Sequence, residues 1–257
     1  LSFTGEADQS VHFSYEMVAL SPKCCSELGL ELSEEESKKP FVEVSGRKGL
    51  GVKADDLISK LVEKSLAEVN TRQPNLSLEK REQIANQIAV GALRYFLLKY
   101  TRTSIIAFDF AEALSFEGET GPYLQYSVVR ARNIFRKVQD QDPHWDPSVW
   151  TRSLDRMWAD SDSVTELLGD NEVWDLFLQI ARLDDSIQHC IRTLEVSHLA
   201  KQAFTLAQQF NLFYHKHHIL SEKDPLRKCF YLTVTDAAQQ GLLKTLALLG
   251  IQVPERM

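Results

Sequence analysis

The sequence predicts a mainly α-helical protein that begins with a small α/β part, and two observations carry this prediction. From residue 54 onward, apolar side chains recur at spacings of three and four, which is typical of helices that bury one face. Before residue 54 the pattern differs, because apolar and polar residues alternate over 11–16 and a glycine-rich stretch follows. We therefore expect a helical bundle over residues 56–257 and a separate segment over residues 1–55.

The first segment holds a candidate strand and a candidate phosphate loop. Val11, Phe13 and Tyr15 alternate with polar residues, so they predict a strand with one buried face, and its sheet is incomplete because no partner strand precedes it. Residues 41–56 then combine three glycines with three cations, a composition that can cradle phosphate. A surface β-turn fits the same residues, and both interpretations stay open.

The first two predicted helices have recognisable boundaries. Acidic residues at the start of a helix interact favourably with its dipole, and Asp55 and Asp56 precede the first run of helically spaced leucines. A turn at residues 73–75 ends that helix. Ser77 is suited to cap the next one, which we expect over residues 78–100 and which leads into a short apolar connection at 105–110.

Three further helices are predicted near the end of the chain, at residues 170–183, 196–215 and 224–249. A Pro- and Asp-rich connector at 139–150 precedes them, and residues 151–169 are too polar to assign. The stripe of the second of these helices consists of Leu199, Ala203, Leu206, Phe210 and Phe213. Gly250 is placed where a helix commonly ends on a glycine.

Residues 115–137 are the stretch on which the functional interpretation of the sequence depends. Gly118 and Gly121 allow a tight loop, and Pro122 suits the first helical position of the helix that follows. One stripe of that helix is apolar: Leu124, Val128, Ala131, Phe135 and Val138. Another face carries rings and cations: Tyr123, Tyr126, Arg130, Asn133 and Lys137, with Arg132 and Arg136 flanking the apolar stripe. Such a face can stack unpaired bases and hold phosphates, although periodicity alone favours an amphipathic core helix with a solvated basic face.

Composition and the remaining motifs narrow the function classes. The net charge of −7 argues against a protein that coats nucleic acid non-specifically, DNA included, but it allows a local basic track. No apolar run approaches a membrane span, and four cysteines without a CxxC pair favour a reducing, cytoplasmic compartment. His215, His217 and His218 lack the spacing of metal ligands, so we expect no metal site.

Three stretches resemble one known family in the correct order. Residues 118–137 (GETGPYLQYSVVRARNIFRK) resemble the segment that opens the anticodon-binding domain of arginyl-tRNA synthetases. HFSYEMV followed by VSGRKG resembles the end of the catalytic domain of these enzymes, and FNLFYHKHHIL with the final LLGIQVPERM resembles their C-terminus. The resemblance implies that residues 1–55 end a class I, Rossmann-like catalytic domain and that residues 56–257 form an all-α anticodon-binding domain.

The resemblance also implies site residues. In class I synthetases a KMSKS-type loop stabilises the pyrophosphate of ATP, and Ser45, Arg47 and Lys48 match its S-x-R-K-G form, although Glu43 and Val44 replace its leading Lys-Met. Together with the face of rings and cations on residues 123–137, the resemblance gives these candidates for tRNA binding: Gly118, Gly121, Tyr123, Tyr126, Arg130, Arg132, Arg136, Lys137, Tyr214 and Met257. Of these, the loop glycines, Tyr123, Tyr214 and Met257 match positions near the anticodon in the family.

The resemblance implies a function for the protein. The parent enzyme would attach arginine to tRNA(Arg) using ATP and Mg²⁺. This chain lacks a HIGH-type signature, so we expect a C-terminal fragment that binds tRNA(Arg) as a monomer and holds neither ATP nor Mg²⁺ alone. We expect it in the cytoplasm, with an organelle not excluded by the sequence. The alternative is a helical protein-interaction module without RNA binding, which only the acidic net charge supports.

Overall fold

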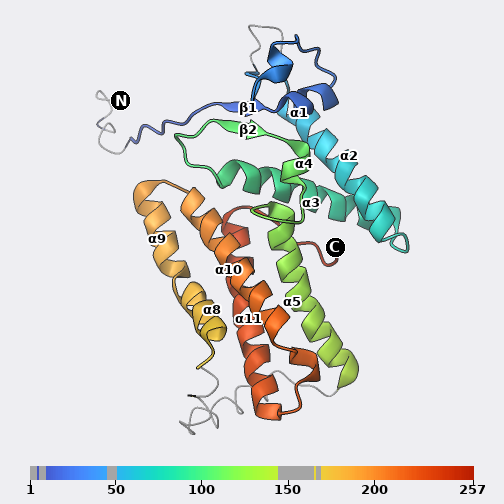
Figure 1. Cartoon of the computed structure of the whole chain (residues 1–257), viewed down its shortest axis with the longest axis vertical. Helices are drawn as coiled ribbons and strands as arrows, with labels where there is room; N and C mark the ends of the chain where they lie inside the picture. The colour runs from blue at the N-terminus through green and yellow to red at the C-terminus, as the bar shows by residue number, and fades with distance from the viewer. Residues whose placement is uncertain (1–4, 6–9, 45–50, 144–164, 166–168) are drawn as a thin grey trace. The chain divides into compact units, whose positions relative to one another are not determined.

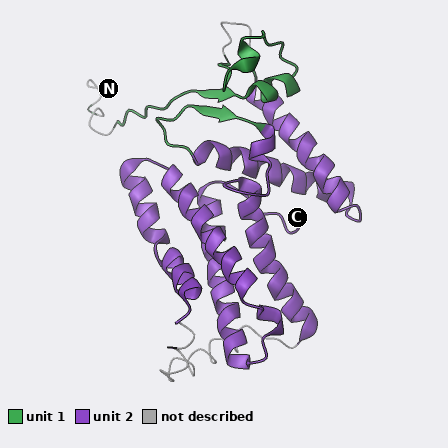
Figure 2. Cartoon of the chain, in the orientation of Figure 1, with its two compact units in different colours: residues 1–52, 100–109 green, residues 53–99, 110–257 purple. Residues whose placement is uncertain are grey.

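The computed structural model describes residues 5, 10–44, 51–143, 165 and 169–257, and the chain divides into two compact units (Figure 2). The first unit comprises residues 1–52 and 100–109, and the second comprises residues 53–99 and 110–257. The first unit therefore takes in residues 100–109, which interrupt the helical part and which the sequence assigns to the second domain.

The first unit is built on a small parallel sheet. β1 (Val18–Leu20) pairs with β2 (Ile106–Phe108), and an isolated antiparallel bridge joins Leu20 to Val42. A short helix, α1 (Pro22–Glu27), follows β1, and the 3₁₀ turn η2 (Glu36–Lys38) comes later. Ser21 links these parts, because its hydroxyl accepts from the Cys24 amide and donates to Asp109 Oδ2 at 2.6 Å.

The strand predicted at residues 11–15 is wrong. The side chains of Val11, Phe13 and Tyr15 are 70%, 49% and 78% exposed, and the strand begins only at Val18. A strand needs a partner's backbone groups, and in the described residues the partner is β2, which the sequence suggested to be a mere connection. Residues 11–15 lie outside the sheet, so their alternating apolar side chains remain exposed.

The second unit begins with a helical hairpin formed by its first two helices (Figure 1). α2 (Ala54–Arg72) packs along α3 (Leu78–Leu98), and α3 in turn packs against α5 (Gly121–Gln141). The short helix α4 (Phe110–Ala113) lies against α3. The predicted boundaries near residues 54 and 78 are confirmed, and Ser77 accepts from the Lys80 amide as the cap.

The rest of the second unit packs around α10 (Ser197–Lys216). This helix contacts α8 (Asn171–Ala181), α9 (Leu183–Thr193), α11 (Pro225–Leu248) and α5. The apolar stripe predicted for α10 is confirmed, because all five of its side chains are buried. The predicted helix at 170–183 is corrected to one that ends at Ala181, and α9 follows it without having been predicted.

The buried surface of α5 is wider than the apolar stripe that the sequence predicts. Leu124, Val128, Ala131 and Val138 are buried as expected, but Phe135 is only half-buried. The structure also buries positions outside that stripe: Gly121, Pro122, Gln125, Ser127, Val129 and Ile134. The cations on α5 therefore extend from a helix that is itself part of the core. None of the described helices is long and apolar enough to cross a membrane.

Candidate nucleic-acid interface

The loop that opens α5 is fixed by local hydrogen bonds. Gly118 has a φ of +77°, which lets the chain reverse before the helix. Thr120 then caps α5, because its Oγ1 accepts from the Tyr123 amide at 3.2 Å and donates to the Ser115 carbonyl at 2.6 Å. Pro122 is the second residue of α5, because the helix begins at Gly121, one residue earlier than predicted. The loop and the aromatic face of α5 are thus held in one arrangement.

The centre of the site is a cation that contacts two aromatic rings. The guanidinium carbon of Arg130 lies 4.8 Å from the centre of the Tyr126 ring and 5.1 Å from that of Tyr214. Arg130 Nη1 donates to Asn211 Oδ1 at 2.5 Å, and Nη2 donates to the Tyr126 hydroxyl at 3.2 Å. Because Tyr214 and Asn211 come from α10, these contacts join α5 and α10 into one surface, which we call the Arg130 stack.

Tyr126 is the most accessible part of the Arg130 stack. Its side chain is 37% exposed, whereas Arg130 and Tyr214 are half-buried. Rings with one accessible face can stack an unpaired base, and a guanidinium between them adds positive charge beside that base. The arrangement is therefore suited to a flat, electron-rich ligand that carries negative charge nearby.

Tyr123 is half-buried beside the Arg130 stack. Its hydroxyl accepts from Asn211 Nδ2 at 2.9 Å, and its ring packs on Phe204 with the centres 5.6 Å apart. Asn211 Nδ2 also donates to Ser127 Oγ at 2.9 Å, so this one amide orients Tyr123 and Arg130 together. The sequence prediction did not include Asn211, although the residue lies inside the FNLFYHKHHIL stretch.

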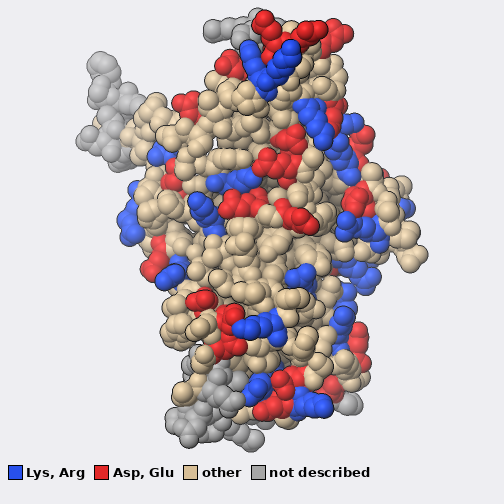
Figure 3. Space-filling model, in the orientation of Figure 1, with Lys and Arg blue, Asp and Glu red and all other residues tan. Residues whose placement is uncertain are grey.

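The remaining cations of α5 are of two kinds. Arg136 and Lys137 are exposed near the end of the helix. Arg132 is half-buried, and its Nη1 donates to the Pro254 carbonyl at 3.0 Å, so the guanidinium is engaged with the C-terminal tail. On the face drawn in Figure 3, Lys and Arg lie among Asp and Glu and form no continuous positive field. A phosphate contact on that face would therefore be local.

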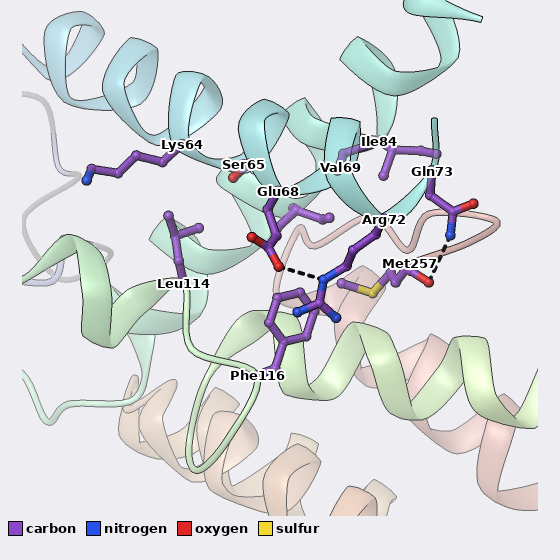
Figure 4. A pocket seen from close by; sticks show the side chains of 11 residues that line it. Lys64, Ser65, Glu68, Val69, Arg72, Gln73, Ile84, Leu114, Phe116 and Met257 are labelled. Atoms are coloured by element: carbon purple, nitrogen blue, oxygen red, sulfur yellow. Dashed lines mark hydrogen bonds and ion pairs between the residues drawn. The ribbon is translucent and has the colours of Figure 1, made fainter. Parts of the chain in front are cut away.

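The C-terminal residue lines an apolar pocket with a volume of about 220 Å³ (Figure 4). The pocket lies between α2, α3, the loop after α4 and Met257. At its edge the Arg72 guanidinium lies 4.9 Å from the ring centre of Phe116 and pairs with Glu68 at 2.6 Å. Gln73 Nε2 donates to the Met257 carbonyl at 3.3 Å. Met257 is thus held at the pocket and does not hang free.

The histidines at the end of α10 have different surroundings. His215 and His218 are exposed, whereas the His217 ring packs against Phe213 and Tyr231. Burial lowers the pKa of His217, and this outweighs the opposite effect of Asp170, whose Oδ2 lies 3.3 Å from Nε2. Within the described residues, no three side chains of the metal-binding types gather into a group.

The predicted phosphate-loop residues Ser45, Arg47 and Lys48 lie outside the described residues. Their role toward ATP stays a prediction. The ten candidate positions for tRNA binding are all described, and printed contacts join six of them into two groups. Tyr123, Tyr126, Arg130 and Tyr214 meet at the α5–α10 surface, whereas Arg132 and Met257 belong to the tail and its contacts. Gly118 and Gly121 lie in the loop and at the first residue of α5, and Arg136 and Lys137 are exposed near the end of that helix.

Comparison with known proteins identifies the family of this domain. The family model described as "DALR anticodon binding domain" matches residues 124–257. The chain is 36% identical to the arginine–tRNA ligase of Clostridium botulinum over 214 residues, which is 83% of this chain and 34% of that protein. It is 32% identical to the arginine–tRNA ligase of Pyrococcus furiosus over 245 residues, covering 95% of this chain and 37% of that protein.

A solved structure agrees over nearly the whole chain. The arginyl-tRNA synthetase of Thermus thermophilus superposes with a TM-score of 0.71 and 25% identity, covering 98% of this chain and 36% of that one. The chain thus spans roughly a third of the length of the relatives it matches. Mainly helical architecture and family are both as the sequence predicted. The chain therefore carries a DALR anticodon binding domain and belongs, with these relatives, to the arginyl-tRNA synthetase family.

Proposed function

We propose that this chain binds tRNA(Arg) by the anticodon arm and serves as the tRNA-binding part of an arginine–tRNA ligase. The observation that carries the proposal is the Arg130 stack, because it presents rings and a fixed cation on one surface of a domain of the anticodon-binding family. Unpaired RNA bases are recognised by stacking on aromatic side chains and on guanidinium planes. An anticodon loop supplies such bases on a strand that carries phosphates.

Each residue of the surface has a distinct role in this proposal. Tyr126 and Tyr214 offer rings to splayed bases, and Arg130 stabilises them in place and supplies charge. Arg136 and Lys137 hold backbone phosphates, which position the RNA without reading its sequence. Tyr123 supports the surface from below through Asn211. The Gly118–Gly121 loop and Met257 border the same RNA on the α3 side of the domain.

The reaction of the whole enzyme is part of the proposal. Arginine and ATP would be its other substrates, with Mg²⁺ accompanying ATP, and Ser45, Arg47 and Lys48 would approach the ATP phosphates. We place the protein in the cytoplasm as a monomer. The competing hypothesis of an interaction module without RNA binding receives no support from the comparisons, whose members are ligases of tRNA.

A tRNA titration across salt concentrations tests the proposal. Replacing Arg136 and Lys137 together by Gln is expected to weaken binding and to flatten the plot of log affinity against log salt by about one unit per lost phosphate contact. A matched control replaces two exposed cations elsewhere, Arg192 on α9 and Lys201 on α10, and is expected to leave the slope unchanged. If both double variants behave alike, the assignment of phosphates to α5 is incorrect. If the parent protein does not bind tRNA, the proposed function itself fails.

A further inference from the structure

The C-terminal tail, residues 252–257, is tied down by side chains from the helices around it. Gln125 Nε2 on α5 donates to the Gln252 carbonyl at 2.7 Å, and Arg132 Nη1 on the same helix donates to the Pro254 carbonyl at 3.0 Å. Gln73, just after α2, donates to the Met257 carbonyl. Hydrogen bonds at three points along six residues therefore hold this segment in one position on the domain.

Gln125 is the more deeply placed of the two residues on α5. Its side chain is fully buried, and Nε2 also donates to the Gln87 carbonyl of α3 at 2.9 Å. Gly91 makes room for it, because a Cβ there would lie 2.6 Å from Gln125 Nε2. One amide group therefore holds α3, α5 and the start of the tail together.

Arg132 fixes the tail two residues further on. The Pro254 side chain is buried, and a proline has no amide hydrogen with which to tie itself to the domain. Its carbonyl can still accept, and Arg132 supplies the donor. This partner also explains why Arg132 differs from Arg136, which is exposed on the same helix.

We propose that Gln125 and Arg132 are positioning residues that order the tail before RNA arrives, and that they affect tRNA binding through the tail and not by contact with RNA. This inference rests on the proposed function. A segment that is already ordered loses less conformational entropy on binding, so affinity improves without a new contact to the ligand. Arg132, expected from the sequence to hold a phosphate, is assigned to the tail instead.

The first experiment measures the tail without RNA. NMR relaxation order parameters of the backbone amides in the tail, which Pro254 lacks, are compared in the parent protein and in Arg132→Met, which keeps an unbranched apolar side chain and removes its donors. Gln125→Met is the second variant, and thermal unfolding reports whether each variant is folded. We expect lower order parameters in the tail of every folded variant and unchanged values in α10. Unchanged order parameters of the tail in folded Arg132→Met would overturn the inference, whatever the protein does with tRNA.

The second experiment separates action through the tail from direct contact. Arg132→Met is combined with a chain that ends at Ile251, and tRNA affinity is measured for both single variants and the double variant. We expect Arg132→Met to lower affinity about tenfold in the full chain, the usual effect of one lost hydrogen bond to a charged group, and to have no further effect without the tail. The control Arg136→Met is expected to lower tRNA affinity by the same factor in the full chain and in the chain that ends at Ile251. An equal loss for Arg132→Met in both chains would show direct RNA contact and overturn the inference.

Discussion

Gly121 lies directly against the backbone of Gly91 where α5 crosses α3. A Cβ placed on Gly121 would come within 2.3 Å of the Gly91 carbonyl oxygen and within 2.9 Å of the Ala92 amide nitrogen. Backbone atoms have no rotamers with which to give way, so the first residue of α5 must lack a side chain. This contact sets the distance between the helical hairpin of α2 and α3 and the helix that carries the Arg130 stack.

Replacing Gly121 by Ala is therefore expected to destabilise the protein by about 1–3 kcal/mol or more, as overpacking does when the helices must move apart. Chemical denaturation measures this change. Gly241→Ala is the matched control, because its Cβ would meet only the flexible end of Leu206 at 3.1 Å. Equal stability of the two variants would show that α3 and α5 separate at little cost.

Leu124→Ala tests the core beneath the Arg130 stack. The Leu124 side chain is fully buried in the cluster that α5 shares with α10 and α11. Its truncation is expected to cost about 2–5 kcal/mol, since a cavity forms in addition to the lost burial. Leu248→Ala on α11, where the side chain is 54% exposed, provides the comparison and is expected to change stability by less than about 1 kcal/mol. Similar losses at the two sites would contradict the assignment of the core.

Tyr214→Ala is expected to weaken binding of cognate tRNA by about 1–3 kcal/mol, because one base loses its stacking partner and Arg130 loses one of its two rings. Removal of Met257 is expected to cost less, since an apolar contact in a pocket is lost. Both losses should be smaller with a tRNA that carries a non-arginine anticodon, because these residues are proposed to lie at the anticodon bases. A residue that contacts only phosphates would show the same loss with both tRNAs, since phosphate contacts carry no sequence information. Filter binding with the two tRNAs measures this. Unaltered binding of cognate tRNA by both folded variants would rule out the anticodon role of these residues.

His217 gives the folded protein a pH dependence. Because burial lowers its pKa below the ordinary value of 6.5, the unfolded chain takes up a proton at a higher pH than the folded chain does. Stability from this group is complete above about pH 6.5 and is lost as the pH falls through the folded pKa. Asp170 and Glu172 oppose the shift, whereas Lys216 and Arg227 support it together with burial.

The measurement is the free energy of unfolding at several pH values between about 7 and 5, a range that includes the ordinary pKa of histidine. His217→Gln is expected to fall less steeply with acidification than the parent protein does. His215→Gln, which alters an exposed neighbour on α10, is expected to follow the parent curve. A parent curve that matches the His217→Gln curve would mean that His217 titrates alike in both states.

The sequence was sufficient for the long helices and insufficient for the sheet. α3, α10 and α11 combine a capping residue or a clear end with a stripe that packing requires, so pattern and structure agree. β2 comprises three residues, and nothing within them identifies Val18–Leu20 as the partner strand. α9 buries only Leu183 among its own residues, so the core fixes little of its sequence.

Site residues were predictable by type more readily than by partner. A helical wheel places Tyr126 and Arg130 on one face because they are one turn apart, and the structure stacks them. No wheel can show that Arg132 faces the Pro254 carbonyl or that Gln125 reaches Gln252, since both contacts depend on where a distant segment returns. For this reason the sequence does not indicate a role for Gln125, and it predicts for Arg132 the same contact with tRNA as for its exposed neighbours.

The pairing of β1 with β2 constrains the order in which the chain can fold during synthesis. Ser21 and Asp109, at the ends of these strands, are 88 residues apart, and the whole α2–α3 hairpin emerges from the ribosome between them. The hairpin consists of local contacts that form quickly, whereas the sheet must wait for its second strand. Until Ile106–Phe108 have been translated, β1 presents an unpaired edge, and a nascent chain that stalls within α3 would expose that edge to chaperones or to a neighbouring chain.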